Sequence, residues 1–285
     1  MAPPRRVLAL CAASVLPACA PRLTTHPRAA QEVERGYRHL GAGDPERAGV
    51  AFEHALAFDP DLPEAENGLG VLARTRGDLA GARRRFERAV RLRSDFAEGH
   101  ANLGETLLAA GDLRGAEAEL RAALTVDPDL ADARQNLGRA LLSAGLAEGA
   151  DRPACFARAR REYLHLLEAE PDRPAAHHDL GFMDFVEGRF DRAEREYRRA
   201  AELSPASPEA LHGLCISLVR LGRCAEGAAA CERCLAAEPG ADRCRRSLAG
   251  ARACGGWRGA APRKRPRPAP RGEHRPRRER EGPPT

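Results

Sequence analysis

Residues 97–130, AEGHANLGETLLAAGDLRGAEAELRAALTVDPDL, contain two amphipathic helical patterns joined by a turn. In the first pattern, Leu103 and Leu107 recur at the spacing of one helix face, and a Gly-Asp pair ends it. In the second, Leu120 and Leu124 mark another such face. An Asp-Pro pair stops that helix because proline disfavours a helical conformation in the residue before it. The stretch therefore predicts a helix-turn-helix hairpin of 34 residues.

The same hairpin recurs along most of the chain. The fourth copy spans 43 residues, nine more than the others, and we expect the extra residues to bulge out as a loop between its two helices. Because one hairpin cannot bury its apolar face alone, the repeats predict an all-α solenoid with a continuous core. A further helical pattern at 242–254 predicts a C-terminal capping helix. We count six copies, at 29–62, 63–96, 97–130, 131–173, 174–207 and 208–241.

The period of 34 residues and the recurring Leu, Gly, Ala and aromatic positions resemble the tetratricopeptide repeat. The resemblance implies a right-handed α-solenoid in which the first helix of each repeat lines a concave groove. We expect this groove to be polar at one end and apolar at the other. In that register the groove positions are Asn67, Val71, Arg74, Ala101, Asn102, Glu105, Leu108, Gln135, Asn136, Arg139, Leu142, His178, Asp179, Phe182, Phe185, Val186, His212, Ile216, Val219 and Arg220.

Two kinds of side chain in this groove indicate a protein partner. Asn102 and Asn136 occupy a position at which tetratricopeptide proteins hold the backbone of an extended peptide, since an amide both donates and accepts hydrogen bonds. The basic pair with which chaperone-binding members clamp a terminal carboxylate does not accompany them. Phe182 and Phe185 would add an aromatic patch of the kind that marks partner sites. The alternative is that either phenylalanine simply packs on a neighbouring helix.

The first residues read as an export signal. Residues 1–18 combine a basic pair, an apolar run of ten residues and small residues before a cleavage point, and the run is shorter than the roughly 20 residues of a spanning helix. The sequence ending at Cys19 is similar to a bacterial lipobox, which predicts that Cys19 is lipidated. With Ala20 next, the resemblance implies the inner leaflet of the outer membrane, with residues 19–28 as a tether. Cleavage after Ala20, which would give a soluble periplasmic protein, is the alternative.

Nine cysteines are unusual for a chain of this length, and in an exported protein they predict disulfides. We expect the capping helix to lie antiparallel to the helix before it. That arrangement brings Cys224 near Cys254, and Cys231 or Cys234 near Cys244. Two such bridges would fasten the end of the solenoid.

The other cysteine chemistries are disfavoured. A zinc site at Cys224, Cys231, Cys234 and Cys244 would need three ligands from one rigid helix to converge, and a Cys-x-x-Cys redox pair would be expected at a helix N-terminus. We interpret Cys155, in the repeat-four insertion, and Cys215 as small buried residues. No metal or cofactor is predicted.

Composition separates the repeats from a basic C-terminal tail. The whole chain carries a formal charge of +5, but residues 258–285 hold ten Lys/Arg against three Glu, an excess of +7, which leaves −2 for the rest. This distribution argues against nucleic-acid binding by the repeats. Residues 255–285 are rich in Arg and Pro without hydrophobic periodicity, so we expect disorder. Such a tail could contact anionic lipid or cell-wall polymer, or remain solvated without a partner.

A lipobox-like signal followed by six repeats resembles the outer-membrane lipoproteins of type IV pilus biogenesis, the PilF/PilW/Tgl type. The resemblance implies a pilotin-like scaffold that assists assembly of a secretin or another envelope complex. No phosphate-binding glycine loop, HExxH motif or nucleophile elbow is present, so we predict no enzymatic activity. The alternatives are a soluble periplasmic adaptor and a recruiting subunit for an envelope enzyme such as a transferase.

Overall fold

The computed structural model describes residues 26–256, which form thirteen α-helices and no β-strand. The predicted signal, Cys19 and the basic tail lie outside this range. No helix within it combines the length and apolar character needed to cross a bilayer. The helices are α1 (Pro27–Gly41), α2 (Pro45–Phe58), α3 (Pro63–Thr75), α4 (Leu79–Leu92), α5 (Ala97–Ala109), α6 (Leu113–Val126), α7 (Ala131–Leu146), α8 (Arg152–Ala169), α9 (Pro174–Val186), α10 (Phe190–Leu203), α11 (Pro208–Arg220), α12 (Cys224–Ala237) and α13 (Asp242–Gly256).

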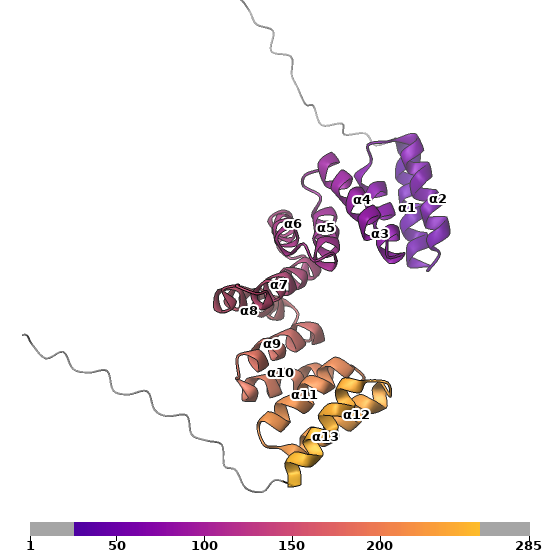
Figure 1. Cartoon of the computed structure of the whole chain (residues 1–285). Coiled ribbons are helices and arrows are strands. Elements are labelled where there is room, and N and C mark those ends of the chain that lie inside the picture. The colour runs from indigo at the N-terminus through magenta and orange to yellow at the C-terminus, as the bar shows by residue number, and fades with distance from the viewer. Residues whose placement is uncertain (1–25, 257–285) are drawn as a thin grey trace, which may run out of the picture.

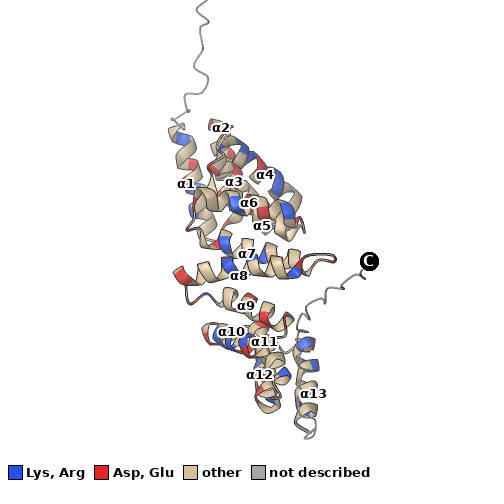
Figure 2. Cartoon of the chain, turned by 90° about the vertical axis from the view of Figure 1, so that its left-hand side faces the viewer, with Lys and Arg blue, Asp and Glu red and all other residues tan. Residues whose placement is uncertain are grey.

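Consecutive helices pair into six hairpins that stack one after another, from α1 and α2 at one end to α11 and α12 at the other (Figure 1). Helix α13 packs on the last hairpin, against both α11 and α12. The all-α solenoid with a capping helix is therefore confirmed. Acidic and basic residues are interspersed over most of the helices (Figure 2), whereas α5 and α9 carry acidic residues and no Lys or Arg.

The turn inside each hairpin follows from two residue types. A glycine adopts the left-handed backbone region, with φ between 72° and 82° at Gly43, Gly77, Gly111, Gly149, Gly188 and Gly222, where a Cβ would be strained. In the first four repeats an aspartate then caps the second helix. In the third, for example, the Asp112 carboxylate accepts a hydrogen bond from the Gly115 backbone N–H at 2.9 Å. A glycine followed directly by the capping aspartate thus marks the start of the second helix in the first three repeats, and in the fourth Ala150 separates Gly149 from the capping Asp151.

The expected bulge in repeat four is wrong. Helices α7 and α8 are 16 and 18 residues long, against 13 and 14 for α5 and α6, and only residues 147–151 connect them. The insertion therefore lengthens both helices. Packing explains this outcome, because the Phe156 ring is buried and lies so close to Gly145 that a Cβ there would be 2.8 Å from the Phe156 Cδ1 atom. The longer hairpin buries an apolar contact of its own.

One contact recurs in the middle of the first five hairpins. A bulky side chain of the second helix presses on a glycine of the first, so closely that a Cβ on the glycine would lie between 2.5 and 3.0 Å from the nearest side-chain atom. The bulky residues are buried and belong to the core. The pairs are Gly36 with Phe52, Gly70 with Phe86, Gly104 with Leu120, Gly138 with Tyr163 and Gly181 with Tyr197.

Replacement of Gly70 by Ala tests this contact. The added Cβ would lie 2.6 Å from the Phe86 ring, so we expect Gly70→Ala to lower the free energy of unfolding by about 1–3 kcal/mol. Gly49→Ala is the matched control, since that Cβ would meet only the Leu72 Cδ1 atom, at 3.5 Å. It should raise stability by about 0.5–1 kcal/mol, the usual helix preference of Ala over Gly. Urea unfolding followed by circular dichroism measures both, and equal effects would contradict the proposed packing role.

Candidate protein-binding groove

The first helices of repeats three, four and five line a hollow of about 490 Å³. Helix α5 contributes Glu105, α7 contributes most of the wall and α9 contributes the far side. Six of the groove positions expected from the sequence lie here together: Glu105, Gln135, Asn136, Arg139, His178 and Asp179. Asp132, Arg173 and Ala175 complete the lining. The hollow is polar and open to solvent, which suits a segment of another chain better than a small apolar ligand.

The carboxylates of this hollow already have partners. Asp179 accepts hydrogen bonds from the Tyr163 hydroxyl at 2.9 Å and from the Gln135 amide at 3.4 Å, and its other oxygen lies 3.0 Å from the His178 Nδ1 atom. Burial and the Asp179 charge raise the pKa of Tyr163, so its hydroxyl keeps the proton that it donates. These contacts hold the floor of the hollow in place.

The other two carboxylates are held by arginines. Asp132 forms an ion pair with Arg173, whose Nε also donates to the Gln135 side-chain oxygen at 2.9 Å. Glu105 forms an ion pair with Arg74 of the preceding repeat. Arg173 lies in the connection before α9, outside the first-helix positions from which the groove was predicted. It was missed for that reason.

Two donors of the hollow have no partner within the described residues. Arg139 is exposed on α7 and forms no ion pair there, and the Asn136 amide, one turn earlier on the same helix, makes no hydrogen bond. Both side chains reach the hollow. A carbonyl or carboxylate oxygen of a bound segment could therefore accept from them without displacing an internal contact.

The asparagines of the earlier repeats are less available. The Asn102 amide donates to the Asn67 side-chain oxygen at 3.0 Å, and Asn67 in turn donates to the Tyr37 hydroxyl at 3.1 Å. This chain of hydrogen bonds links the first three repeats, and Asn67 is buried. Of the two asparagines expected to hold a peptide, the structure leaves the amide of Asn136 free and engages that of Asn102.

The apolar end of the groove is more covered than the sequence suggested. Phe182 packs against the core on both sides of α9, and the Phe185 ring meets the Phe190 ring edge-on at 5.4 Å. Arg220 lies over the Phe190 ring at 4.1 Å. Both phenylalanines thus pack on neighbouring helices, as in the alternative considered above, and neither is an exposed aromatic side chain. The aliphatic groove positions at this end are half-buried; they are Val186, Ile216 and Val219.

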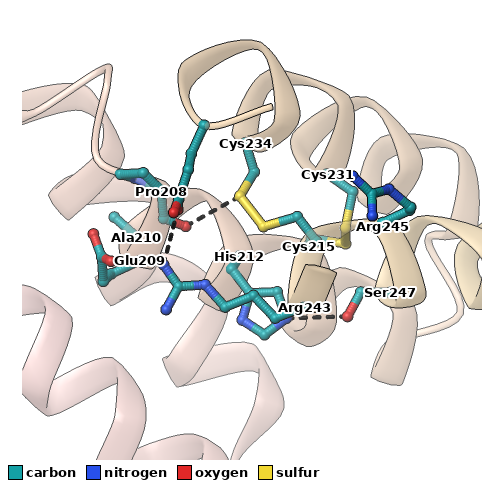
Figure 3. The surroundings of a disulfide bond; sticks show 12 residues. Pro208, Glu209, Ala210, His212, Cys215, Cys231, Cys234, Arg243, Arg245 and Ser247 are labelled. Carbon is teal, nitrogen blue, oxygen red and sulfur yellow. Dashed lines mark hydrogen bonds and ion pairs between the residues drawn. A yellow bond between two sulfur atoms is a disulfide. The ribbon is translucent and has the colours of Figure 1, made fainter. Parts of the chain in front are cut away.

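The remaining groove positions fall into two groups. Leu142 is buried in the core, and Val71, Ala101 and Leu108 pack against that same core. His212 lies under the cap, with its Nε2 atom 3.0 Å from the Ser247 hydroxyl (Figure 3). Burial, together with the charges of Arg243 and Arg246, lowers the pKa of His212. It therefore belongs to the junction between α11 and α13.

Three disulfides fasten the last hairpin and the cap. Cys224 is bonded to Cys254 and Cys234 to Cys244, so α12 is joined to α13 at both ends. The Cys234 Sγ atom also lies 3.4 Å from the Pro208 carbonyl oxygen (Figure 3). Both pairs are among those considered from the sequence. Within residues 26–256 no group of His, Cys, Asp or Glu side chains is arranged to hold a metal ion.

The interpretation of Cys215 as a simple buried residue is wrong, because it is bonded to Cys231 across the sixth hairpin. The repeat register contained the signal. Cys215 stands where the five earlier repeats have their close-contact glycine, and Cys231 stands where they have the bulky residue that presses on it. The two side chains therefore face each other. Cys155 remains a free thiol, partly exposed on α8.

Peptide mapping without reduction tests this connectivity. We expect cross-linked fragments that join Cys215 to Cys231, Cys224 to Cys254 and Cys234 to Cys244. Removing the outer pair with Cys224→Ser and Cys254→Ser should lower stability by about 2–4 kcal/mol, because it frees a long loop of the unfolded chain. Fragments joining Cys231 to Cys244 would contradict the structure.

Comparison with known proteins agrees with this fold. A family model described as tetratricopeptide repeat matches residues 73–129, and a second model of the same description matches residues 33–98 and 184–242. Together the matches cover more than half of the chain. No curated protein matches the sequence.

Several solved structures are similar. Pseudomonas aeruginosa PilF superposes with a TM-score of 0.67 at 19% identity, covering 78% of this chain and 97% of that one. PilW, a widely conserved type IV pilus biogenesis factor, gives 0.67 at 19% identity over 77% and 98%. TTC0263, a tetratricopeptide protein of Thermus thermophilus, gives 0.55 at 22% identity over 67% and 99%. At these identities the likeness shows the fold alone.

Proposed function

We propose that this chain, which belongs to the tetratricopeptide repeat family, is a non-catalytic scaffold that holds a segment of a client protein in the hollow formed by α5, α7 and α9. The observation that carries the proposal is that two hydrogen-bond donors in that hollow are unpaired within the described residues. Every carboxylate there is already partnered, whereas the Arg139 guanidinium and the Asn136 amide have no partner in the described chain. The bound segment would supply acceptor oxygens to both.

A rigid floor makes such capture efficient. The contacts around Asp179 and Arg173 link repeats four and five before any client arrives, so little side-chain ordering remains for binding to oppose. We therefore expect the client to lie across α7 with a carbonyl or an acidic side chain at Arg139. The partly buried Phe182 and Phe185 would support the wall of the groove and would not be the first point of contact.

We further propose that the scaffold is anchored by a lipid on Cys19 in the outer membrane, facing the periplasm, and assists assembly of a secretin-like subunit there. The lipobox-like sequence and the structural likeness to PilF and PilW support this proposal. An anchor would act by concentrating client segments at the membrane. A soluble periplasmic adaptor, or a subunit that recruits an envelope enzyme such as a transferase, is the alternative.

Substitution of the free donors tests client capture. The double variant Asn136→Ala/Arg139→Ala should reduce the amount of client recovered with the tagged full-length protein from its own envelope by about tenfold, the effect of losing one charge-assisted hydrogen bond. Both side chains lie at the surface of the hollow, so the thermal midpoint should stay unchanged. Arg233→Ala, an exposed arginine of α12 far from the hollow, is the matched control. Equal recovery from the double variant and the control would rule out this site.

The intact mass of the mature protein, purified from its own membranes without reductant, tests the anchor. We expect a polypeptide that begins at Cys19 and carries several acyl groups. One acyl group binds a membrane only marginally, so a stable anchor needs more than one. A lipid-free mass beginning at Pro21 would remove the anchor and favour the soluble adaptor. If the protein is a lipoprotein, Cys19→Ala should move it from the membrane fraction to the soluble fraction. If it is a soluble adaptor, Cys19→Ala should leave its fractionation unchanged.

A further inference from the structure

A second and larger hollow, of about 700 Å³, lies on the first two repeats, on the side away from the groove positions. Its walls come from the second helices α2 and α4, and its floor comes from α3. On α3 the residues that line it are Glu66, Leu69, Leu72 and Ala73, with Arg76 at the helix end, whereas the groove positions of the same helix are Asn67, Val71 and Arg74. We call this space the second-helix hollow. It shares no lining residue with the hollow between α5, α7 and α9.

Gly49 leaves one side of the second-helix hollow unfilled. Gly49 occupies a position on α2 that is filled in the later repeats by Arg83, Glu117, Arg160, Glu194 and Ala228. Three of these side chains bridge to the next repeat: Glu117 pairs with Arg158, Arg160 with Asp184 at 2.8 Å, and Glu194 with Arg223 at 3.4 Å. Gly49 has no side chain to make such a bridge. The space between the first and second repeats therefore stays open.

The exposed apolar side chain on this wall is larger than at the same position of any later repeat. Val50 is 52% exposed; repeats two, four and five have Arg84, Arg161 and Arg195 there, and repeats three and six have the exposed alanines Ala118 and Ala229. Leu69, half-buried, lies in the same lining. An aliphatic side chain of a partner would find a larger apolar contact here than at the equivalent alanines.

Opposite charges stand on the two walls without meeting. Glu46 and Glu53 are exposed on α2, Arg84 is exposed on α4, Arg76 is exposed at the turn before it, and none of the four forms an ion pair within the described chain. Between them lies Glu66, which is fully buried. Its carboxylate is held by Arg85 at 2.9 Å and by Arg88 at 3.3 Å, yet its Oε1 atom accepts no hydrogen bond. The α2 wall of the hollow is therefore acidic, and the α4 wall is mainly basic, with Asp78 at its start. Between the walls, Leu69, Leu72 and Ala73 lie beside the Glu66 ion pairs.

We propose that the second-helix hollow docks an amphipathic helix of a partner protein, with an aliphatic side chain in the space left by Gly49. The basic edge of that helix lies along Glu46 and Glu53, and its acidic edge lies along Arg76 and Arg84. Two parallel helices with an open floor between them are the usual frame for receiving a third helix, and the charge order fixes its direction. This docking is independent of client capture at Arg139, because the two hollows share no residue.

A designed probe tests the proposal directly. We would measure, by fluorescence anisotropy, binding of the full-length protein to a labelled synthetic helix of about 18 residues that carries a leucine pair four residues apart, Arg along one flank and Glu along the other. A second helix of the same composition, with Arg and Glu mixed equally on both flanks so that neither docking direction matches the walls, is the charge control. We expect the first helix to bind at least tenfold more tightly at low salt. Equal affinity for both helices would overturn the proposed charge order.

Filling the hollow is the second arm of the experiment. Gly49→Arg introduces the residue that repeat two carries at the same position, so the helix should be retained while the space is closed. We expect it to weaken probe binding at least tenfold, whereas Gly49→Ala, which leaves most of the space, should preserve binding. Capture of the envelope client should be unchanged in both variants. Probe binding that survives Gly49→Arg would overturn the site. If Gly49→Ala also abolished probe binding, the loss could not be attributed to closing the space, and the site would be overturned as well.

Discussion

The structure depends on the close approach of a glycine in the first helix of a repeat to a bulky side chain in the second. At Gly36, Gly70 and Gly104 a Cβ would lie 2.5 or 2.6 Å from that side chain, so only glycine permits the spacing. In the first repeat the Phe52 ring also presses on Gly68 of the next repeat, where a Cβ would be 2.4 Å away. One residue thus sets both the spacing within a hairpin and the step between hairpins. Because packed interiors tolerate little added volume, this contact fixes the period of the solenoid.

The core packing is the same in each of these hairpins, whereas the charged residues that join its two helices differ from repeat to repeat. The fourth residue of the first helix pairs with the same position of the second helix in four repeats: Glu66 with Arg85 at 2.9 Å, His100 with Glu119 at 2.7 Å, Arg134 with Glu162 at 3.2 Å and His177 with Glu196 at 2.8 Å. In repeat two the acid is on the first helix, and in the others it is on the second. The reversal places a buried carboxylate under the second-helix hollow. The two positions remain paired although their residues change. These contacts therefore preserve the geometry of the hairpin, and no particular charged residue is required.

The periodic part of the molecule could be predicted from sequence, and the departures from periodicity could not. The hairpins, their turns and the capping helix follow from Leu and Gly spacing, from Gly-Asp pairs and from a last helical pattern. The extension of α7 and α8 did not, because nothing in a count of extra residues shows that Phe156 will pack on Gly145. The groove could be located by register, but its hydrogen-bonding state could not, since the engagement of Asn102 with Asn67 depends on side-chain contacts between repeats. Arg173 was missed because it lies on a connection. The Cys215 disulfide was missed because Cys215 was interpreted only as a small residue at the glycine position. The position that faces it in the hairpin, Cys231, was not considered as its partner.

The last repeat shows why the two faces of the solenoid can change independently of its core. In repeat six the glycine and the bulky residue are both cysteine, and a disulfide between Cys215 and Cys231 takes the place of the packing contact. The chain can therefore exchange one means of joining two helices for another at the same positions. The groove and the second-helix hollow use other positions of the same helices, such as Arg139 on α7 and Gly49 on α2. Because the core contact does not involve them, these residues are free to differ from repeat to repeat. A binding surface can then be confined to one or two repeats while every hairpin keeps the same internal geometry.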